Sequence, residues 1–522
     1  MRAQHRNSEH KRSNRRISRR RFLRQAVTIT GAFVVPRKVA EGLHGQNQQL
    51  TVSALDWLQP RNRWRTSDYF YFQKGLKGPR KLGHLIERFP IEKLSDLVAR
   101  PRVDSYDQIS ALFDRFAARV VDPGAALLPI PAYLLPVLRT LAPPPAENSS
   151  ELAAELVELF WAAALRDVPF DAYSRSDQCT TAAKELAELG LIQQDDPEKL
   201  FAPRSSSWPG QTFPSQFFTS PTREWPRYAE QKYPAFAEGR DYLTDKAVWQ
   251  HAQSGEASPG RFSNLDPNPK PVNTGRCLAS LVYRDHPTQF FVSACLQLYE
   301  FNNTVWSVQK PFRHQDGIAP FLLGGLPHAL SCISRCVELA LRLCWHAKWG
   351  TFMYPRPEEV AYWCGEKANR SLARVSDILL NSKALALVRL KTSTSQTSLL
   401  PQVYPDGAPL HPSYPAGHAV AAGAAITAIK AFIRPNASFP ASSVGSNGIS
   451  PLSASVNTEL NKLAWSVAFG RSFAGIHYRG DCEAGINLGE EVALHLLRQE
   501  KKTYPISYNI SIIRFDGRSV RI

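Results

Sequence analysis

No segment of the 522-residue sequence approaches 18 uninterrupted apolar residues. A helix needs about that many apolar residues to cross the hydrocarbon core of a bilayer, so we expect no integral membrane span in the mature protein. Runs that alternate apolar and polar residues are almost absent, and no internal repeat is visible. These absences favour an all-α protein over one built on sheets.

The chain is also poor in cysteine clusters that would suggest a metal site. It has eight cysteines, and none of them forms a zinc-like group with nearby histidines. Cys332 and Cys336 are four residues apart on a predicted helix. We therefore expect buried thiols, although pairing in an oxidising compartment cannot be decided from the sequence.

The charge is unevenly distributed. The formal net charge is +17, but residues 1–24 contain ten Lys and Arg residues and only one acid, Glu9. The modest positive charge on the rest of the chain is spread out, and it would attract small anions such as halide or phosphate. We therefore expect no nucleic-acid partner.

Residues 1–45 explain the basic excess. Arginines 19–21 precede a short apolar stretch, 25–35, and then Pro36. This arrangement is typical of a twin-arginine export signal and predicts a periplasmic or extracellular protein. The alternative is a basic disordered arm beside a short buried helix.

The remainder of the chain predicts a large helical protein. The 43% of hydrophobic residues can form a large core, and 39 prolines predict long ordered loops. We expect an N-terminal helical part, 46–310, and a C-terminal helical bundle, 311–522, that form one continuous globular unit. The apolar periodicity predicts helices at 151–165, 287–307, 327–349, 370–383, 417–433, 457–470 and 480–499, and a further helix that begins at Ser105.

Three segments in the last third place basic residues and histidines at predicted helix ends. They are Lys348 to Glu359, which contains Arg356-Pro357; His411 to His418, with the sequence His-Pro-Ser-Tyr-Pro-Ala-Gly-His; and Arg471 to Asp481, which contains His477.

These residue types suit an oxyanion with about two negative charges. Two arginines and a lysine supply fixed positive charge, and a glycine at a helix start brings backbone N–H groups close to an anion. Two histidines supply a metal ligand or nucleophile and a proton donor. Asp481, four residues after His477, would hold the other imidazole nitrogen or would pair with Arg471.

The order and spacing of the three segments resemble the signature shared by vanadium-dependent haloperoxidases and soluble acid phosphatases: Lys and Arg-Pro, then Pro-Ser-Gly-His, then Arg-x5-His-x3-Asp. Seven residues separate Lys348 from Arg356, which is similar to the bacterial and red-algal bromoperoxidase-like branch. Residues 155–170 and 324–328 also resemble that branch. The likeness extends from about residue 50 to the C-terminus and implies an all-α fold of helical bundles.

The resemblance implies a vanadate cofactor and a role for each candidate residue. His477 would coordinate the vanadium as the metal ligand, His418 would act as acid–base, and His411 would be a second histidine of the bromoperoxidase type. Asp481 completes the catalytic set. The oxyanion-binding residues would be Lys348, Arg356, Ala416, Gly417 and Arg471.

The implied activity is the oxidation of bromide or iodide by hydrogen peroxide to hypohalous acid, with the metal acting as a Lewis acid. Two alternatives remain. A phosphatase would use His477 to attack phosphorus and His418 to protonate the leaving group, and an inactive homologue would only bind the oxyanion. Relatives commonly form oligomers, so the resemblance also implies a homo-oligomer.

Ala416 departs from the family pattern, which has serine before Gly-His. The missing hydroxyl removes a donor to the anion, which typically costs about 1.5–3 kcal/mol, or roughly ten- to hundredfold in vanadate affinity. Ser413 is three residues earlier, and the sequence leaves open whether its hydroxyl reaches the anion.

Overall fold

The computed structural model describes residues 74, 96–99, 102–113, 120–204, 213–220, 222–224, 227–254, 265–306, 321–365, 372–392, 398–439, 455–504 and 509–522. The predicted export signal and basic arm, residues 1–45, lie outside the described residues. All of the described residues belong to one compact unit, Ala54–Ile522. The predicted division at residue 310 is not tested by this unit and stays a prediction.

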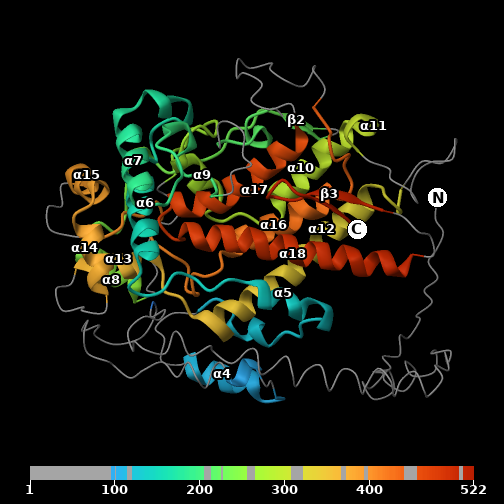
Figure 1. Cartoon of the computed structure of the whole chain (residues 1–522), viewed down its shortest axis with the longest axis horizontal. Helices are drawn as coiled ribbons and strands as arrows, with labels where there is room; N and C mark the ends of the chain where they lie inside the picture. Colours follow the sequence, from blue (N-terminus) through green and yellow to red (C-terminus); the bar gives the residue numbers. More distant parts are fainter. Residues whose placement is uncertain are drawn as a thin grey trace, which may run out of the picture. The chain divides into compact units, whose positions relative to one another are not determined.

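The described part of the chain is mainly helical (Figure 1). Its α-helices are α4 (Ser105–Phe113), α5 (Leu135–Thr140), α6 (Ser150–Leu165), α7 (Asp177–Glu188), α8 (Lys246–Gln253), α9 (Gly275–Leu281), α10 (Gln289–Glu300), α11 (Asn302–Val305), α12 (Leu326–Trp345), α13 (Pro357–Gly365), α14 (Ala373–Leu380), α15 (Lys383–Thr392), α16 (Gly417–Lys430), α17 (Val456–Phe473) and α18 (Arg479–Thr503). The all-α prediction is confirmed.

Shorter elements connect these helices. The 3-10 turns are η2 (Pro123–Leu127), η3 (Ala132–Leu134), η4 (Phe170–Arg175), η5 (Pro197–Lys199) and η6 (Gln216–Phe218). Two antiparallel hairpins pair β1 (Thr222–Glu224) with β2 (Arg227–Ala229) and β3 (Ser511–Ile513) with β4 (Ser519–Arg521). In register, Thr222 lies opposite Ala229 and Ser511 opposite Arg521.

Side-chain caps at their N-termini fix several helix starts. The Ser149 hydroxyl accepts a hydrogen bond from the Leu152 N–H at 3.1 Å, and α6 begins at the next residue. Ser455 caps α17 in the same way, through the N–H of Thr458. These caps satisfy backbone donors that a helix start otherwise leaves without partners.

The helices that carry the predicted motifs pack together, and α16 makes its most extensive contacts with α18. Small residues let these two helices approach closely. A Cβ added at Gly423 would collide with the carbonyl oxygen of Ile486 on α18, and one added at Gly489 would collide with that of Val420 on α16. Figure 1 shows α12, α16, α17 and α18 running beside one another.

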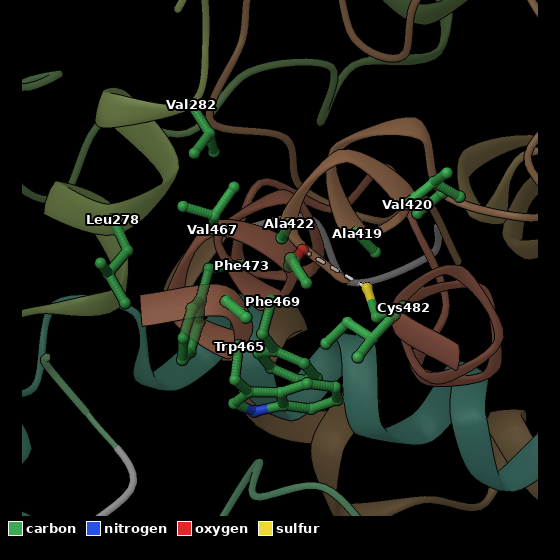
Figure 2. Close-up of a cluster of buried hydrophobic side chains, with 14 of the residues drawn as sticks. Leu278, Val282, Ala419, Val420, Ala422, Trp465, Val467, Phe469, Phe473 and Cys482 are labelled. Atoms are coloured by element: carbon green, nitrogen blue, oxygen red, sulfur yellow. Dashed lines mark hydrogen bonds between the residues drawn. The ribbon is translucent and has the colours of Figure 1, made fainter. Parts of the chain in front are cut away.

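An apolar core joins the N-terminal and C-terminal parts of the described chain, because its buried residues run from Leu134 to Ile522. Figure 2 shows one part of this core, where residues from α9, α16, α17 and α18 meet. Phe469 and Phe473 pack edge to face there, with ring centroids 5.2 Å apart. The core includes cysteines, and all eight cysteines of the chain are buried free thiols. The expectation of buried thiols is confirmed.

None of the described helices is both long enough and apolar enough to cross a membrane.

Candidate functional site

Lys348 lies in a π-helical segment, η7 (His346–Phe352), that continues α12. Here the Met353 N–H donates to the Lys348 carbonyl oxygen five residues back, and Met353 then adopts a left-handed conformation with φ 47°. Such widened turns are frequent at functional sites. The Lys348 ammonium is fully buried and donates to the carbonyl oxygens of Pro412 (2.6 Å) and Ser413 (2.8 Å). The first predicted segment therefore contacts the second.

Arg356 precedes the proline that opens α13, and its guanidinium is fully buried. Its Nε donates to the His411 carbonyl oxygen at 2.9 Å, and its Nη1 donates to the Ile476 carbonyl oxygen at 2.9 Å. The same Nη1 lies 2.9 Å from Nε2 of His477. Arg356 thus joins all three predicted segments.

His477 is buried beside Asp481, and its Nδ1 lies 2.8 Å from Oδ2 of that carboxylate. An ionised carboxylate only accepts hydrogen bonds, so Nδ1 carries the imidazole proton and Nε2 presents a lone pair. Burial lowers the pKa of His477 well below its usual value, and the nearby cations Arg356 and Lys348 lower it further. The sequence left the partner of Asp481 open between His477 and Arg471, and the structure shows His477.

Asp481 is held by more than the histidine. The Ser413 hydroxyl donates to its Oδ2 at 2.5 Å, and the Tyr478 N–H donates to the same oxygen at 3.2 Å. Burial raises the pKa of Asp481 to about 6, an increase that the Ser413 hydroxyl and Lys348 partly oppose. Since its hydroxyl is committed to Asp481, Ser413 does not supply the donor that Ala416 lacks.

Ala416 and Gly417 form the start of α16. The Ala416 N–H donates to the Asp481 carbonyl oxygen at 3.0 Å, and its own carbonyl accepts from the Val420 N–H at 3.0 Å. No side chain caps this helix, because alanine has no acceptor to offer. Gly417 is the first residue of the helix, so its N–H has no acceptor within the helix and suits an anion.

Arg471, near the C-terminal end of α17, is buried and has no carboxylate partner in the described ranges. Its Nη1 donates to the Val282 carbonyl oxygen and lies 3.4 Å from the Tyr404 hydroxyl, and its guanidinium stacks over the Tyr404 ring at 5.3 Å. Its Nε is buried without a hydrogen-bond partner among the described residues. This N–H is an unused donor of a charged group.

His418, the second residue of α16, pairs with Asp285 through Nε2 and Oδ1 at 2.8 Å. The side chain of His418 is 25% exposed, whereas Asp285 is 3% exposed. Burial and the Arg471 charge lower the pKa of His418, and Asp285 partly opposes this shift. Sequence reasoning missed Asp285, because a single aspartate in the turn between α9 and α10 has no informative spacing.

His411 lies against the Arg356 guanidinium. Its Nδ1 is 3.0 Å from the Pro412 carbonyl oxygen and 3.0 Å from Nη2 of Arg356, and its Nε2 is 3.3 Å from the same Nη2. Its ring packs on Trp345, with centroids 5.4 Å apart. Burial and Arg356 lower the pKa of His411 well below its usual value, which makes this imidazole neutral.

The electrostatics of these residues are unusual for a protein interior. No carboxylate in the described part of the chain forms an ion pair with Lys348, Arg356 or Arg471, whose side chains contact carbonyl oxygens, a tyrosine and histidines. Burial lowers the pKa of Lys348 to about 7 and that of Arg356 to about 10. Buried cations are normally paired, so the arrangement indicates an anion that supplies the negative charge.

The donor set fits a tetrahedral oxyanion. The three cations, the Nε of Arg471 and the uncapped start of α16 supply N–H donors, and Nε2 of His477 supplies a lone pair. In the described residues, no group of three or more histidines, cysteines and carboxylates has metal-binding geometry. A metal held here would thus arrive as an oxyanion with its own oxygen ligands. Fold and site together define a helical-bundle protein with a buried cationic oxyanion site.

Comparisons with known proteins agree with this description of the fold and the site. A family model described as the VCPO second helical-bundle domain matches residues 336–504. The vanadium-dependent bromoperoxidase of Ascophyllum nodosum is 31% identical over 442 residues, which cover 77% of each chain. That of Corallina officinalis is 30% identical over 311 residues, which cover 54% of this chain and 52% of the relative. The chain belongs to the vanadium-dependent haloperoxidase family.

A solved structure shows the same fold. The second vanadate-dependent bromoperoxidase of Ascophyllum nodosum, a homohexamer, superposes with a TM-score of 0.72 over 99% of this chain and 94% of that chain. Its sequence identity is 21%, so this likeness supports the fold alone.

Proposed function

We propose that this protein is a haloperoxidase that binds orthovanadate and uses hydrogen peroxide to oxidise bromide or iodide to hypohalous acid. The observation that carries the proposal is the set of three buried cations without carboxylate partners in the described structure, beside the Nε2 lone pair of His477. The vanadium-dependent bromoperoxidases with which the chain aligns support the same chemistry.

The residues present would hold vanadate through His477 Nε2 and would neutralise its oxygens with Lys348, Arg356 and Arg471. When bound, vanadate supplies a Lewis acid that activates hydrogen peroxide toward attack by halide. Asp481 keeps the proton on Nδ1 of His477, so that Nε2 stays available as a ligand.

His418 is the proposed acid–base group. Its Nε2–H bonds to Asp285, which orients the ring and leaves Nδ1 to take up or release a proton. Burial and Arg471 lower the pKa of His418, so the neutral form that accepts a proton predominates near neutral pH. Its partial exposure also suits a group that must exchange protons with solvent.

The test is bromination of monochlorodimedone by the metal-free protein before and after incubation with orthovanadate. We expect activity only after vanadate is added, and none from His477→Ala, which removes the ligand atom but leaves the cations. If the wild-type protein gains no bromination or iodide oxidation at any pH from acidic to neutral, the proposal fails.

Phosphate-ester hydrolysis is the second candidate, because the neutral His477 with a lone pair on Nε2 beside three cations also suits attack on phosphorus. Phosphatase turnover that vanadate inhibits, together with no halide oxidation, would favour it. A non-catalytic oxyanion-binding protein would instead bind vanadate in calorimetry without turnover of either kind.

We propose further that the protein is exported through the twin-arginine-type signal in residues 1–45 and that it forms a homo-oligomer. The Ascophyllum nodosum homohexamer with a similar fold supports self-association. Cell fractionation of the full chain against an Arg20→Lys, Arg21→Lys variant tests export, and light scattering coupled to gel filtration tests the oligomer.

A further inference from the structure

Helix α6 buries two glutamates that face the start of α18. Glu155 and Glu158 are three residues apart on α6 and thus lie on one side of it, and both are fully buried. Helix α18 begins at Arg479 and carries Asp481 in its first turn. The two glutamates therefore lie next to the first turn of α18, which contains Asp481, the residue that hydrogen-bonds to His477.

The two glutamates have different surroundings. Both oxygens of Glu158 are within hydrogen-bond distance of Nε of Arg479, at 2.9 and 3.1 Å, which accounts for its burial. Glu155 instead accepts from Nη2 of Arg204 at 2.6 Å through Oε1 alone, and its Oε2 is buried without a hydrogen-bond partner in the described structure. The side chain of Arg204 is 36% exposed and is shared with Glu151 at 3.4 Å. Glu155 is thus less well paired than Glu158.

The Glu155 carboxylate presses against the backbone of Gly480. A Cβ added at Gly480 would lie 2.9 Å from Oε1 and 3.1 Å from Oε2, so a larger residue here would require the Glu155 carboxyl group to move. Burial raises the pKa of Glu155 to about 8, and Arg204 and, to a smaller extent, the Gly480 N–H lower it. The contact thus fixes the path of the chain one residue before Asp481.

We propose that Glu155 is a positioning residue, which sets the direction of Asp481 through its contact with Gly480 and thereby orients the His477 ring. The inference rests on the proposed function only in naming vanadate as the ligand of His477. Asp481 has one carboxylate oxygen, Oδ2, for His477, Ser413 and Tyr478 together, so a small shift of its turn changes all three hydrogen bonds.

The variants separate the contact from the carboxyl group. Glu155→Gln keeps the length and replaces the carboxyl group by an amide, whereas Glu155→Asp keeps the carboxyl group but withdraws it from Gly480 by one methylene. Glu151→Ala is the matched control, because Glu151 is on the same helix and contacts the same Arg204 but is not among the neighbours of Gly480.

The first measurement is the ¹⁵N and ¹H resonance of the His477 Nδ1–H group in the metal-free protein, assigned with His477→Gln. We expect Glu155→Asp to shift or broaden this resonance, and Glu155→Gln and Glu151→Ala to leave it as in the wild type. A wild-type resonance in Glu155→Asp, or a loss that occurs in Glu155→Gln instead, would overturn the proposal.

The second measurement is vanadate affinity by calorimetry, with the urea midpoint as a check on folding. Loss of a group that orients a metal ligand typically weakens affinity about 10- to 100-fold, and we expect a loss in this range for Glu155→Asp but not for Glu155→Gln. Gly480→Ala, which displaces the Glu155 carboxyl group from this position, should reproduce the loss. Wild-type vanadate affinity in folded Glu155→Asp and Gly480→Ala would also overturn the proposal. If the wild-type protein does not bind vanadate, the proposed function fails, whereas the resonance still tests the role of Glu155.

Discussion

Two groups of buried cations near His477 differ in their partners. Arg479 is two residues from His477 and is fully buried, yet it is neutralised by Glu158 and stacks near Trp465 at 5.9 Å. Lys348 and Arg356 are equally buried and hydrogen-bond mainly to carbonyl oxygens. The difference shows that burial alone does not mark a functional cation.

The ion pair between Arg479 and Glu158 should contribute strongly to the stability of the fold. Glu158→Gln removes the charge that neutralises Arg479 and should lower the free energy of unfolding by about 3–5 kcal/mol, as expected when one partner of a buried ion pair is removed. Urea denaturation of the metal-free protein measures this loss. Glu151→Gln, whose glutamate is 56% exposed, serves as the control and should change stability little. An unchanged unfolding midpoint for Glu158→Gln would remove the basis of the comparison.

The unpaired group should behave in the opposite way. Arg356→Met removes a buried charge that has no carboxylate partner in the described chain, but it also leaves the His411 and Ile476 carbonyl oxygens without this donor, so the metal-free protein should lose less stability than Glu158→Gln does. Vanadate affinity should fall by about 1.5–3 kcal/mol, or roughly ten- to hundredfold, for each charged hydrogen bond lost. Calorimetry measures the vanadate affinity, and urea denaturation of the same preparation measures the stability. A large loss of stability with unchanged vanadate affinity would show that Arg356, like Arg479, has a structural role.

Ala416→Ser adds a neutral donor next to the unpaired cations. If the hydroxyl reaches the anion, vanadate affinity should rise roughly ten- to hundredfold, because a hydrogen bond to a charged group is worth about 1.5–3 kcal/mol. Titration of the metal-free protein with vanadate measures the gain, and Ala419→Ser, on the same helix, is the control. Equal affinities for Ala416→Ser and the wild type would show that the cations already satisfy the anion.

Lys348 should make anion binding depend on pH. Burial lowers the pKa of Lys348 to about 7, so its charged fraction in the metal-free protein falls as the pH rises above that value. Vanadate affinity should then fall by at most about tenfold per pH unit, and Lys348→Met should flatten this part of the profile. The stability of the metal-free protein should rise with pH from about 7 toward 10.5, because the unfolded chain keeps the lysine proton longer. If vanadate affinity depends on pH in the same way in Lys348→Met and in the wild type, Lys348 does not have this role.

Much of the fold could be predicted from apolar periodicity, but the ends of the helices could not. The helix expected at 327–349 ends as α12 at Trp345 and continues as a π-helical segment to Phe352. The helix expected at 287–307 is divided into α10 and α11. Periodicity reports which face is buried, whereas helix ends depend on contacts with distant segments such as the one from Lys348 to Pro412.

The sequence by itself determined the helical class, the order and spacing of the basic and histidine residues, and the absence of the serine hydroxyl at Ala416, because these are properties of residues close together along the chain. Tertiary structure decided which acid serves which histidine. His477 rather than Arg471 is the partner of Asp481, the Ser413 hydroxyl is committed to Asp481, and Asp285 reaches His418 from 133 residues away. Whether a buried cation is neutralised depends on segments that only folding brings together, so a local sequence pattern cannot predict it.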